Sequence, residues 1–395
     1  MAFNYEINQL ELMQARIKSV PHGWQFTYVG KAFCIRNNLR KPISEEERSM
    51  SPGNYPYYGP TKIQGYIGTF EQDGSYALIG EDGDHFLKFE KHSMTQLVDG
   101  KCTVNNHAHI IEGTKEASRE WFYYYFMHRD IFSFLSRQGA GRYKLNKASL
   151  EKMPLLLPPI VEQKKIAQIL STWDKAISVT EKLLANSQQQ KKALMQQLLT
   201  GKKRLLDENG VRFSGEWRNS TLSMFCNIAK GKALSASDLE VGDFPVIAGG
   251  KSSPYSHSDY THENVVTVSA SGAYAGYISY HNYKIWASDC SVVSAKADNL
   301  IDYFYQLLLS LQDKIYSLQS GGAQPHIYPK DLNSIPLWVP CVKEQQKIAA
   351  VLSAADAEIS TLEKKLACLR DEKKALMQQL LTGKRRVKVD EAVAE

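Results

Sequence analysis

The sequence of 395 residues lacks several features that mark whole classes of protein. Its six cysteines are scattered and form no C-x-x-C pair, so they indicate reduced thiols and neither a disulfide framework nor a zinc site. No apolar run approaches the roughly 18 residues that cross a bilayer. The segment 1–19 carries charges every few positions and has no apolar centre, unlike a signal peptide. We therefore expect a cytoplasmic protein with no membrane contact.

Motifs for catalysis are missing as well. The sequence has no H-E-x-x-H, no G-x-G-x-x-G after a strand, and no N-P-P-[FY] tetrapeptide of the amino-methyltransferase type. AGGKSS at 248–253 resembles the end of a phosphate-binding loop, but Pro245 stands where that motif requires a small residue. His107 and His109 alternate along a predicted strand, which places them on opposite faces and disfavours a shared metal. The chain alone is therefore not expected to be an enzyme, and we predict no metal or cofactor site in it.

The net charge of +6 is unevenly distributed. Residues 1–153 hold 19 basic and 17 acidic side chains, and residues 154–204 hold 9 and 3. Residues 205–335 hold 9 and 13, and residues 336–395 hold 11 and 9. The largest positive excess thus lies in 154–204. An excess this local and modest does not by itself identify a nucleic-acid-binding protein.

What the sequence does contain is an internal duplication. The stretch KKALMQQLLTGK occurs at 191–202 and again at 373–384. Around it, residues 154–204 align without gaps to residues 336–386, with 30 identities in 51 positions. The segments before these repeats are less alike, although GAGRYKLNKASLEKMP and GGAQPHIYPKDLNSIP also stand 182 residues apart. The chain is therefore built as variable block, constant unit, variable block, constant unit.

Each constant unit is predicted to form one long helix. Apolar residues recur at alternating spacings of four and three from 166 to 198 and from 348 to 380, which is the seam of a coiled coil. Prolines precede each helix, and Gly201 and Gly383 follow as C-terminal stops. A helix of about 38 residues is about 57 Å long. A seam of that length needs a partner, and the other copy is the obvious one.

Lys191 and Lys373 interrupt this apolar seam at equivalent positions. A lysine in a seam either extends along the helix surface to place its ammonium group in solvent, or fixes the register of the two helices. We favour the first interpretation.

The variable blocks are predicted to be mixed α/β. Runs rich in β-branched and aromatic residues indicate strands, and amphipathic patterns late in each block indicate helices over 115–137 and 299–319. The predicted strands are QGYIGTF, YALIGE, CTVNNHAHII, VVTVSAS, YAGYISY and WASDCSVVSA.

The sequence resembles the specificity (S) subunits of type I restriction–modification systems. The resemblance rests on this alternating plan and on LPP-x2-EQ-x-KIA-x-ILS-x2-D within 156–174, VP-x3-EQ-x-KIA-x-VLS-x2-D at 339–356, and the LTGK[KR]R ends of both repeats. It implies an α+β fold in which two pseudo-two-fold-related α/β target recognition domains are separated by two long antiparallel coiled-coil helices. The implied segments are target recognition domain 1 (1–153), a central conserved helical region (154–204), target recognition domain 2 (205–335) and a C-terminal conserved helical region (336–395).

The resemblance also implies function and partners. Each recognition domain would recognise one half of a split, asymmetric site in double-stranded DNA, and the paired helices would set the spacing between the halves. Two modification (M) subunits, which use S-adenosylmethionine to methylate adenine N6, would dock on this scaffold. Restriction (R) subunits, which use ATP and magnesium, would join them. The S subunit would confer specificity on both activities and catalyse neither.

Candidate DNA-contacting residues follow from residue type and internal correspondence. Base edges are recognised by side chains with hydrogen-bonding forks or amides on exposed loops, and two glycine-bounded loops in each block offer such groups. Asn105 and Asn106 are a further possibility. The candidates are Lys62, Gln64, Arg142, Tyr143, Lys144 and Asn146 in the first block, and Lys251, Ser252, Ser253, Gln324 and His326 in the second.

Two other hypotheses fit parts of the sequence. A duplicated coiled-coil adaptor that binds only proteins would account for the helices and for the acidic second block, but not for two divergent β-rich blocks in equivalent places. A single-chain DNA-modifying enzyme is disfavoured by the missing methyltransferase and nuclease motifs.

Overall fold

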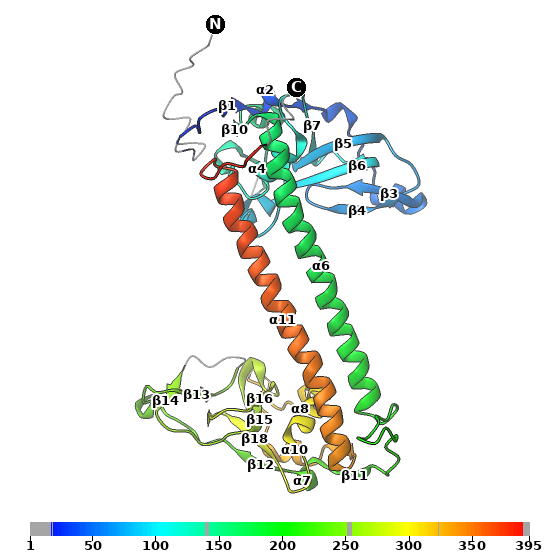
Figure 1. The fold of residues 1–395 in the computed structure, drawn as a ribbon, viewed down its shortest axis with the longest axis vertical. Coiled ribbons are helices and arrows are strands. Elements are labelled where there is room, and N and C mark those ends of the chain that lie inside the picture. The colour runs from blue at the N-terminus through cyan, green and yellow to red at the C-terminus, as the bar shows by residue number, and fades with distance from the viewer. Residues whose placement is uncertain (1–16, 18, 139–141, 251–254, 323, 390–395) are drawn as a thin grey trace. The chain divides into compact units, whose positions relative to one another are not determined.

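The computed structural model describes Ile17 and residues 19–138, 142–250, 255–322 and 324–389 (Figure 1). The chain forms two compact units, Met1–Val179 with Leu366–Glu395, and Thr180–Lys365. The two longest helices are α6 (Ile160–Leu198) and α11 (Val342–Leu380). Because the division between the units falls inside both helices, each unit contains the first half of one and the last half of the other.

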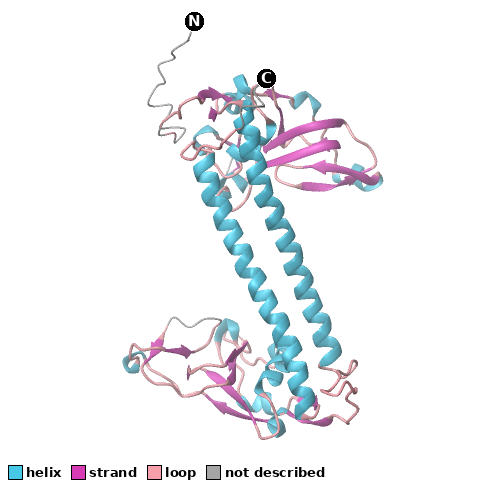
Figure 2. Ribbon diagram, in the orientation of Figure 1, coloured by secondary structure: helices cyan, strands magenta, loops and turns pink. Residues whose placement is uncertain are grey.

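The first unit is built on a six-stranded sheet (Figure 2). Its strands are antiparallel except for the parallel pair β3–β6. In spatial order they are β2 (Cys34–Ile35), β7 (Ala108–Glu112), β5 (Gln72–Gly80), β6 (Thr95–Val104), β3 (Pro52–Tyr58) and β4 (Ile63–Ile67). The strands β5 and β6 pack against α4 (Arg119–Phe126), whose Trp121 and Phe122 are fully buried.

The first unit also contains smaller elements. They are β1 (Gln25–Tyr28) paired with β10 (Pro154–Leu157), the hairpin β8 (Ser136–Gln138) and β9 (Arg142–Lys144), the helices α2 (Val29–Ala32), α3 (Glu45–Met50) and α5 (Lys147–Glu151), and the 3-10 turns η1 (Asn37–Leu39), η2 (Asp84–Lys88) and η3 (Phe132–Phe134).

Two sequence predictions for this unit are wrong in part. The strand predicted through CTVNNHAHII is two strands, because Asn105 Oδ1 accepts the N–H of His107 at 2.8 Å and closes a turn between β6 and β7. Of the helix predicted over 115–137, only α4 is helical, and it ends at Phe126. Beyond it, the Asp130 carboxylate accepts the N–H of Phe132 at 2.9 Å and β8 pairs with β9, so the backbone groups of a continued helix are already used.

The second unit has a four-stranded and a three-stranded sheet. The first contains β12 (Cys226–Lys230), β18 (Cys290–Ala295), β15 (Val265–Ser269) and β16 (Ile278–His281), all antiparallel. The second contains β14 (Ser256–His257), β13 (Phe244–Ile247) and β17 (Trp286–Ala287). The other elements are β11 (Arg218–Thr221) paired with β19 (Pro336–Val339), α7 (Leu222–Phe225), α8 (Ile301–Ser310), α9 (Gln312–Tyr316), α10 (Pro329–Asn333), η4 (Ala236–Asp238) and η5 (Gly272–Tyr274). The helix predicted over 299–319 is thus interrupted at Leu311.

Within each unit, the halves of α6 and α11 lie side by side and antiparallel. In the first unit Ile166 and Leu170 share a core with Met377 and Leu380. In the second, Leu198 shares a core with the α11 residues 348, 349 and 352. The positions of the predicted seam are buried or half-buried throughout α6, as the four–three spacing requires.

Both long helices end as the sequence predicts. Gly201 and Gly383 each have φ of 69°, the left-handed conformation that terminates a helix, and each donates its N–H to the carbonyl three residues earlier at 3.3 Å. A side chain at Gly383 would also collide with Pro21, whose Cγ lies 2.2 Å from the position of a Cβ. Among the described residues, no helix combines the length and apolar character that a membrane crossing demands.

Candidate nucleic-acid interface

The β3–β4 hairpin carries the first pair of predicted residues. Lys62 is exposed in its turn, and Gln64 is exposed on β4. The Oε1 of Gln64 accepts a hydrogen bond from Asn105 Nδ2 at 3.0 Å, so the hairpin contacts the β6–β7 turn. Gly59 permits this arrangement, because a Cβ there would lie 2.5 Å from Gln64 Cδ. The structure thus brings Gln64 together with Asn105, residues from two loops that are distant in sequence.

The β8–β9 hairpin carries the second group. Arg142 is exposed, and Lys144 is half-buried with its Nζ 3.2 Å from Glu81 Oε1. The ring of Tyr143 packs against Phe132 with centroids 5.2 Å apart. Asn146 is the N-cap of α5, where its Oδ1 accepts the N–H of Ser149 at 2.8 Å. Its side-chain oxygen therefore has a defined structural role at the base of the hairpin.

Acidic and basic residues outside the predicted set connect these loops. Glu81 accepts a hydrogen bond from Arg40 and forms an ion pair with Lys144. Arg40 also donates a hydrogen bond to the carbonyl of Asn106 at 3.0 Å. Burial alone would raise the pKa of Glu81, but the hydrogen bonds from Arg40 and Lys144 hold that pKa below its ordinary value. No sequence pattern signals these pairings, because the partners are separated by 41 and 63 positions.

The two histidines of the β6–β7 region have different environments. His107 lies in the turn, half-exposed, with Nδ1 2.9 Å from Asp82 Oδ2. His109 is buried on β7, its Nε2 2.6 Å from the carbonyl of Leu145 and its Nδ1 2.8 Å from Asn37 Nδ2. Burial lowers the pKa of His109, and a neutral ring satisfies both contacts by donating to Leu145 and accepting from Asn37. His109 thereby ties the end of the β8–β9 hairpin to the sheet.

Together these contacts form one polar surface on the first unit. It presents the amide group of Gln64 and the cations of Lys62 and Arg142, while Lys144 pairs with Glu81 and the buried Asn105 supports Gln64 through their hydrogen bond. Amide and guanidinium side chains are the groups that recognise adenine and guanine edges in the major groove. The surface therefore has the chemistry required to contact DNA bases.

The second unit has a comparable convergence of loops around Ser271. His326 forms backbone bridges with both Ser271 and Ser320, and its ring lies over Tyr328 with centroids 6.0 Å apart. A Cβ on Gly249 would lie 3.2 Å from the carbonyl oxygen of Ser271, so the loop after β13 approaches the same place. Gln324 is exposed on the turn between Ser320 and His326. The predicted Lys251, Ser252 and Ser253 lie outside the described residues.

A clasp of Glu, Arg and Trp joins the two helix halves in the first unit. Arg386 donates from Nε to Glu162 Oε1 at 2.7 Å and from Nη2 to Oε2 at 2.8 Å. Trp24 Nε1 donates to the same Oε2 at 3.0 Å. The Glu162 side chain is 4% exposed, so three charge-assisted bonds satisfy a buried carboxylate at the start of α6.

The second unit repeats this clasp with the equivalent residues. Arg204 donates to the two carboxylate oxygens of Glu344 at 2.6 and 2.7 Å, and Trp217 Nε1 donates at 3.3 Å. Arg204 and Glu344 are 182 positions from Arg386 and Glu162, respectively. The duplication has therefore conserved a three-dimensional contact as well as a sequence.

The seam lysines are also repeated as contacts. In the first unit Lys373 Nζ lies 2.5 Å from Asp174 Oδ1, and Tyr124 donates its hydroxyl to Oδ2 of the same carboxylate at 2.7 Å. Burial and the neighbouring Asp174 both raise the pKa of Tyr124, so its hydroxyl stays protonated as a donor.

In the second unit Lys191 Nζ lies 2.5 Å from Asp356 Oδ1, and Gln306 Nε2 donates to Oδ2 at 2.7 Å. The side chains of Lys191 and Lys373 are only 13% and 12% exposed. The expectation that these lysines extend along the helix into solvent is therefore wrong. Each lysine instead crosses the seam to an aspartate on the other helix, because that carboxylate offers a partner that an apolar seam lacks.

Comparison with known proteins identifies the family. A model of the type I restriction modification DNA specificity domain matches residues 7–186 and 214–369, which together are most of the chain. A putative type I restriction enzyme specificity subunit of Haemophilus influenzae is 27% identical over 340 residues, covering 80% of this chain and 84% of that protein. The putative type I restriction enzyme MjaX specificity subunit of Methanocaldococcus jannaschii is 24% identical, covering 95% and 96%. The chain belongs to this family of specificity subunits, the non-catalytic components of type I restriction–modification systems.

The fold agrees with that assignment. The crystal structure of the type I restriction–modification S subunit from M. genitalium matches with a TM-score of 0.71 at 17% sequence identity, covering 96% of this chain and 98% of that one. The predicted α+β fold with two long helices is therefore confirmed. At this identity the match extends to the fold and not to individual DNA-contacting residues.

Proposed function

We propose that this chain directs a type I restriction–modification complex to a bipartite, asymmetric DNA site, with one half-site recognised by each variable block. The observation that carries the proposal is the repetition of two contacts at an offset of 182 residues, the Arg–Glu contact of the clasp and the Lys–Asp pair, beside blocks whose sheets differ. The repeated helical units have stayed alike, which fits binding to two identical partner subunits. The variable blocks have diverged, which fits recognition of two different DNA half-sites.

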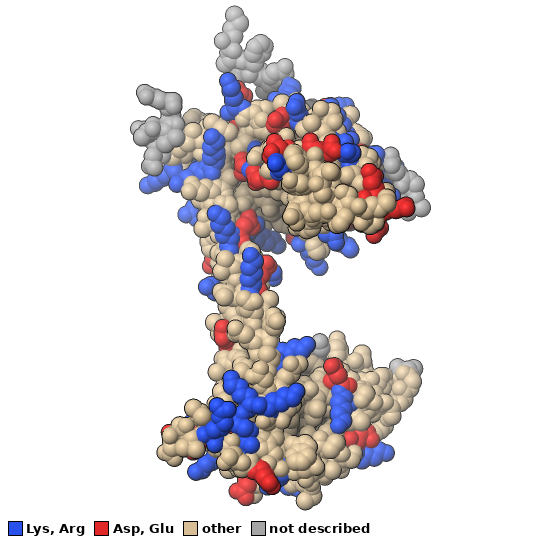
Figure 3. All heavy atoms as spheres, turned by 90° about the vertical axis from the view of Figure 1, so that its right-hand side faces the viewer, with Lys and Arg blue, Asp and Glu red and all other residues tan. Residues whose placement is uncertain are grey.

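The helices act in this proposal as an antiparallel coiled coil that fixes the distance between half-sites. Two M subunits dock on the equivalent scaffolds and methylate adenine N6 with S-adenosylmethionine, and R subunits supply ATP- and magnesium-dependent cleavage. The complex works in the cytoplasm, where chromosomal and invading DNA are accessible. Basic side chains that gather on the second unit in the view of Figure 3 offer a surface for DNA phosphates, although the block 205–335 is acidic overall.

Mapping of N6-methyladenine tests this function. The genomes of cells that carry the gene with its neighbouring methyltransferase gene, and of cells from which this gene alone is deleted, are compared by single-molecule sequencing. We expect two short half-sites separated by a fixed gap, methylated only when the gene is present. If an active methyltransferase leaves no split motif that depends on this gene, the recognition function is refuted and a protein-binding adaptor becomes the better account.

A further inference from the structure

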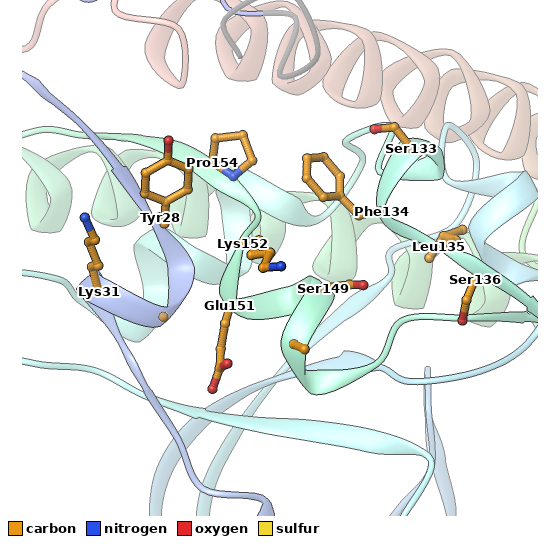
Figure 4. Close-up of a pocket in the computed structure, with 12 residues that line it drawn as sticks. Tyr28, Lys31, Ser133, Phe134, Leu135, Ser136, Ser149, Glu151, Lys152 and Pro154 are labelled. Carbon is orange, nitrogen blue, oxygen red and sulfur yellow. The ribbon is translucent and has the colours of Figure 1, made fainter. Parts of the chain in front are cut away.

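A cleft of about 760 Å³ lies in the first unit beside the β8–β9 hairpin (Figure 4). Its walls come from three segments that are distant in sequence, the β1–α2 junction, the η3 turn with the start of β8, and α5. Gly30 allows α2 to approach α5, because a Cβ there would lie 2.9 Å from Glu151 Cβ. The cleft is therefore a feature built by packing between segments, and it lies outside the polar surface described above.

The lining combines cations, hydroxyl groups and an apolar floor. Figure 4 shows Lys152 extending into the cleft toward Ser149, Lys31 and Tyr28 at one end, and Phe134 opposite. Among the described residues Lys152 forms no ion pair. The one acid in the lining, Glu151, points away from the cleft in Figure 4 and lies 3.7 Å from Lys147. A ligand with a compact negative charge and a less polar portion fits this lining.

The surrounding segment is strongly positive only in the first block. Residues 136–153 contain five basic and one acidic side chain, a net charge of +4, whereas the equivalent residues 318–335 contain one of each. Because 1–153 as a whole carries only +2, the rest of that block is slightly acidic. The positive charge is thus concentrated at the hairpin and the cleft.

We propose that this cleft holds the sugar–phosphate backbone of DNA beside the half-site recognised by the first block. The inference rests on the proposed function. Ser136 in the cleft wall is the first residue of β8, and the paired strand β9 carries the candidate DNA-contacting residues Arg142 and Lys144. DNA that is contacted by β9 therefore brings a backbone phosphate near Lys31 and Lys152 of the cleft, and lysine and serine are common phosphate partners.

Salt dependence of DNA binding tests the cleft. The complex of this chain with its methyltransferase partner is titrated with DNA that contains the mapped motif, and with a scrambled duplex, between 50 and 200 mM salt. Each phosphate contact contributes about 0.9 to the slope of log affinity against log salt, or a three- to fourfold change over that range. Lys152→Ala and Lys31→Ala should each lower the slope by about one contact, weaken both duplexes equally and leave the methylated motif unchanged.

Two control variants make the result specific. Lys152→Arg keeps the charge and should keep the slope, while Lys115→Ala removes an exposed lysine of the β7–α4 loop that does not line the cleft and should also leave the slope unchanged. A wild-type slope in both cleft variants overturns the proposal, as does a weaker association with the methyltransferase at unchanged slope, which would indicate an acidic protein segment instead. Failure of the wild-type complex to discriminate the two duplexes would refute the proposed function itself.

Discussion

Lys191 of α6 and Asp356 of α11 form an ion pair with Nζ and Oδ1 2.5 Å apart, and the residues 182 positions away, Lys373 and Asp174, form the same pair at the same distance. Each pair lies in the packed seam of its own unit. Because a displacement of one helix by a heptad in one direction would place each lysine against an alanine, Ala349 or Ala167, the pairs favour the observed register over that displacement.

Removal of one partner of such a pair should destabilise the protein. Lys373→Met leaves the Asp174 carboxylate with only the Tyr124 hydroxyl, and we expect a cost of about 1–2 kcal/mol in the free energy of unfolding. The double variant Lys373→Met with Asp174→Leu should cost less than the sum of the two single changes. Urea unfolding of the four proteins measures this coupling, and Lys374→Met, at an exposed neighbouring position, serves as the control.

The two clasps should contribute unequally to stability. Arg204→Ala should destabilise more than Arg386→Ala, because Arg204 is 21% exposed against 43% for Arg386 and the Glu344 side chain it leaves behind is 1% exposed. We expect about 2–4 kcal/mol for Arg204→Ala and roughly half of that for Arg386→Ala. Thermal unfolding provides the comparison, with Lys203→Ala as a matched control on an exposed neighbour. Equal effects of Arg204→Ala and Lys203→Ala would show that the clasp contributes nothing.

Stability should fall on mild acidification. Burial lowers the pKa of His281 to about 4, and the ring lies 2.9 Å from the hydroxyl of Thr267. Since the pKa of an unfolded histidine is about 6.5, the unfolded chain takes up a proton that the folded chain rejects, and stability is lost as the pH falls from 6.5 toward 4. Urea midpoints at pH 7 and pH 5 should therefore differ less in His281→Gln than in the wild type. An identical pH dependence would contradict the buried, neutral histidine.

Two variants of the polar surface on the first unit should affect DNA binding differently, one changing sequence discrimination and the other changing overall affinity. Gln64→Ala is expected to relax discrimination at one position of one half-site by about 1–3 kcal/mol, because an amide selects a base edge. Lys62→Ala is expected to weaken binding to all sequences alike, because an exposed ammonium group acts mainly on phosphates. Binding measured against a panel of single-base variants of the mapped site distinguishes the two effects.

The sequence predicted those parts of the fold whose signals are local or repeated. The two helices and their glycine ends followed from heptad spacing and from Gly201 and Gly383. The β6–β7 turn at Asn105 was missed because β-rich residues flank it on both sides and the turn is closed by a side chain. The pairing of Glu81 with Arg40 and Lys144 could not be foreseen, since it depends on how distant strands align in the sheet.

The candidate DNA-contacting residues stay predictions, and the structure shows only where they lie. Residue type and internal correspondence selected Gln64 and Lys144, which the structure places at loops joined by shared contacts. Asn146 was selected by the same criteria, although its side-chain oxygen caps α5. The seam lysines were misinterpreted because each Asp partner lies on the other repeat, and the sequence of one helix does not show which residue faces it.

Exchange of the first variable block tests the central claim most directly. Residues 22–153 are replaced by the corresponding block of another specificity subunit, and N6-methyladenine is mapped in cells that carry the chimera with the same methyltransferase. We predict that one half-site changes, while the other half-site and the gap between them stay the same. A change in both half-sites, or a methylated chimera with the original motif, would contradict the assignment of one half-site to each block.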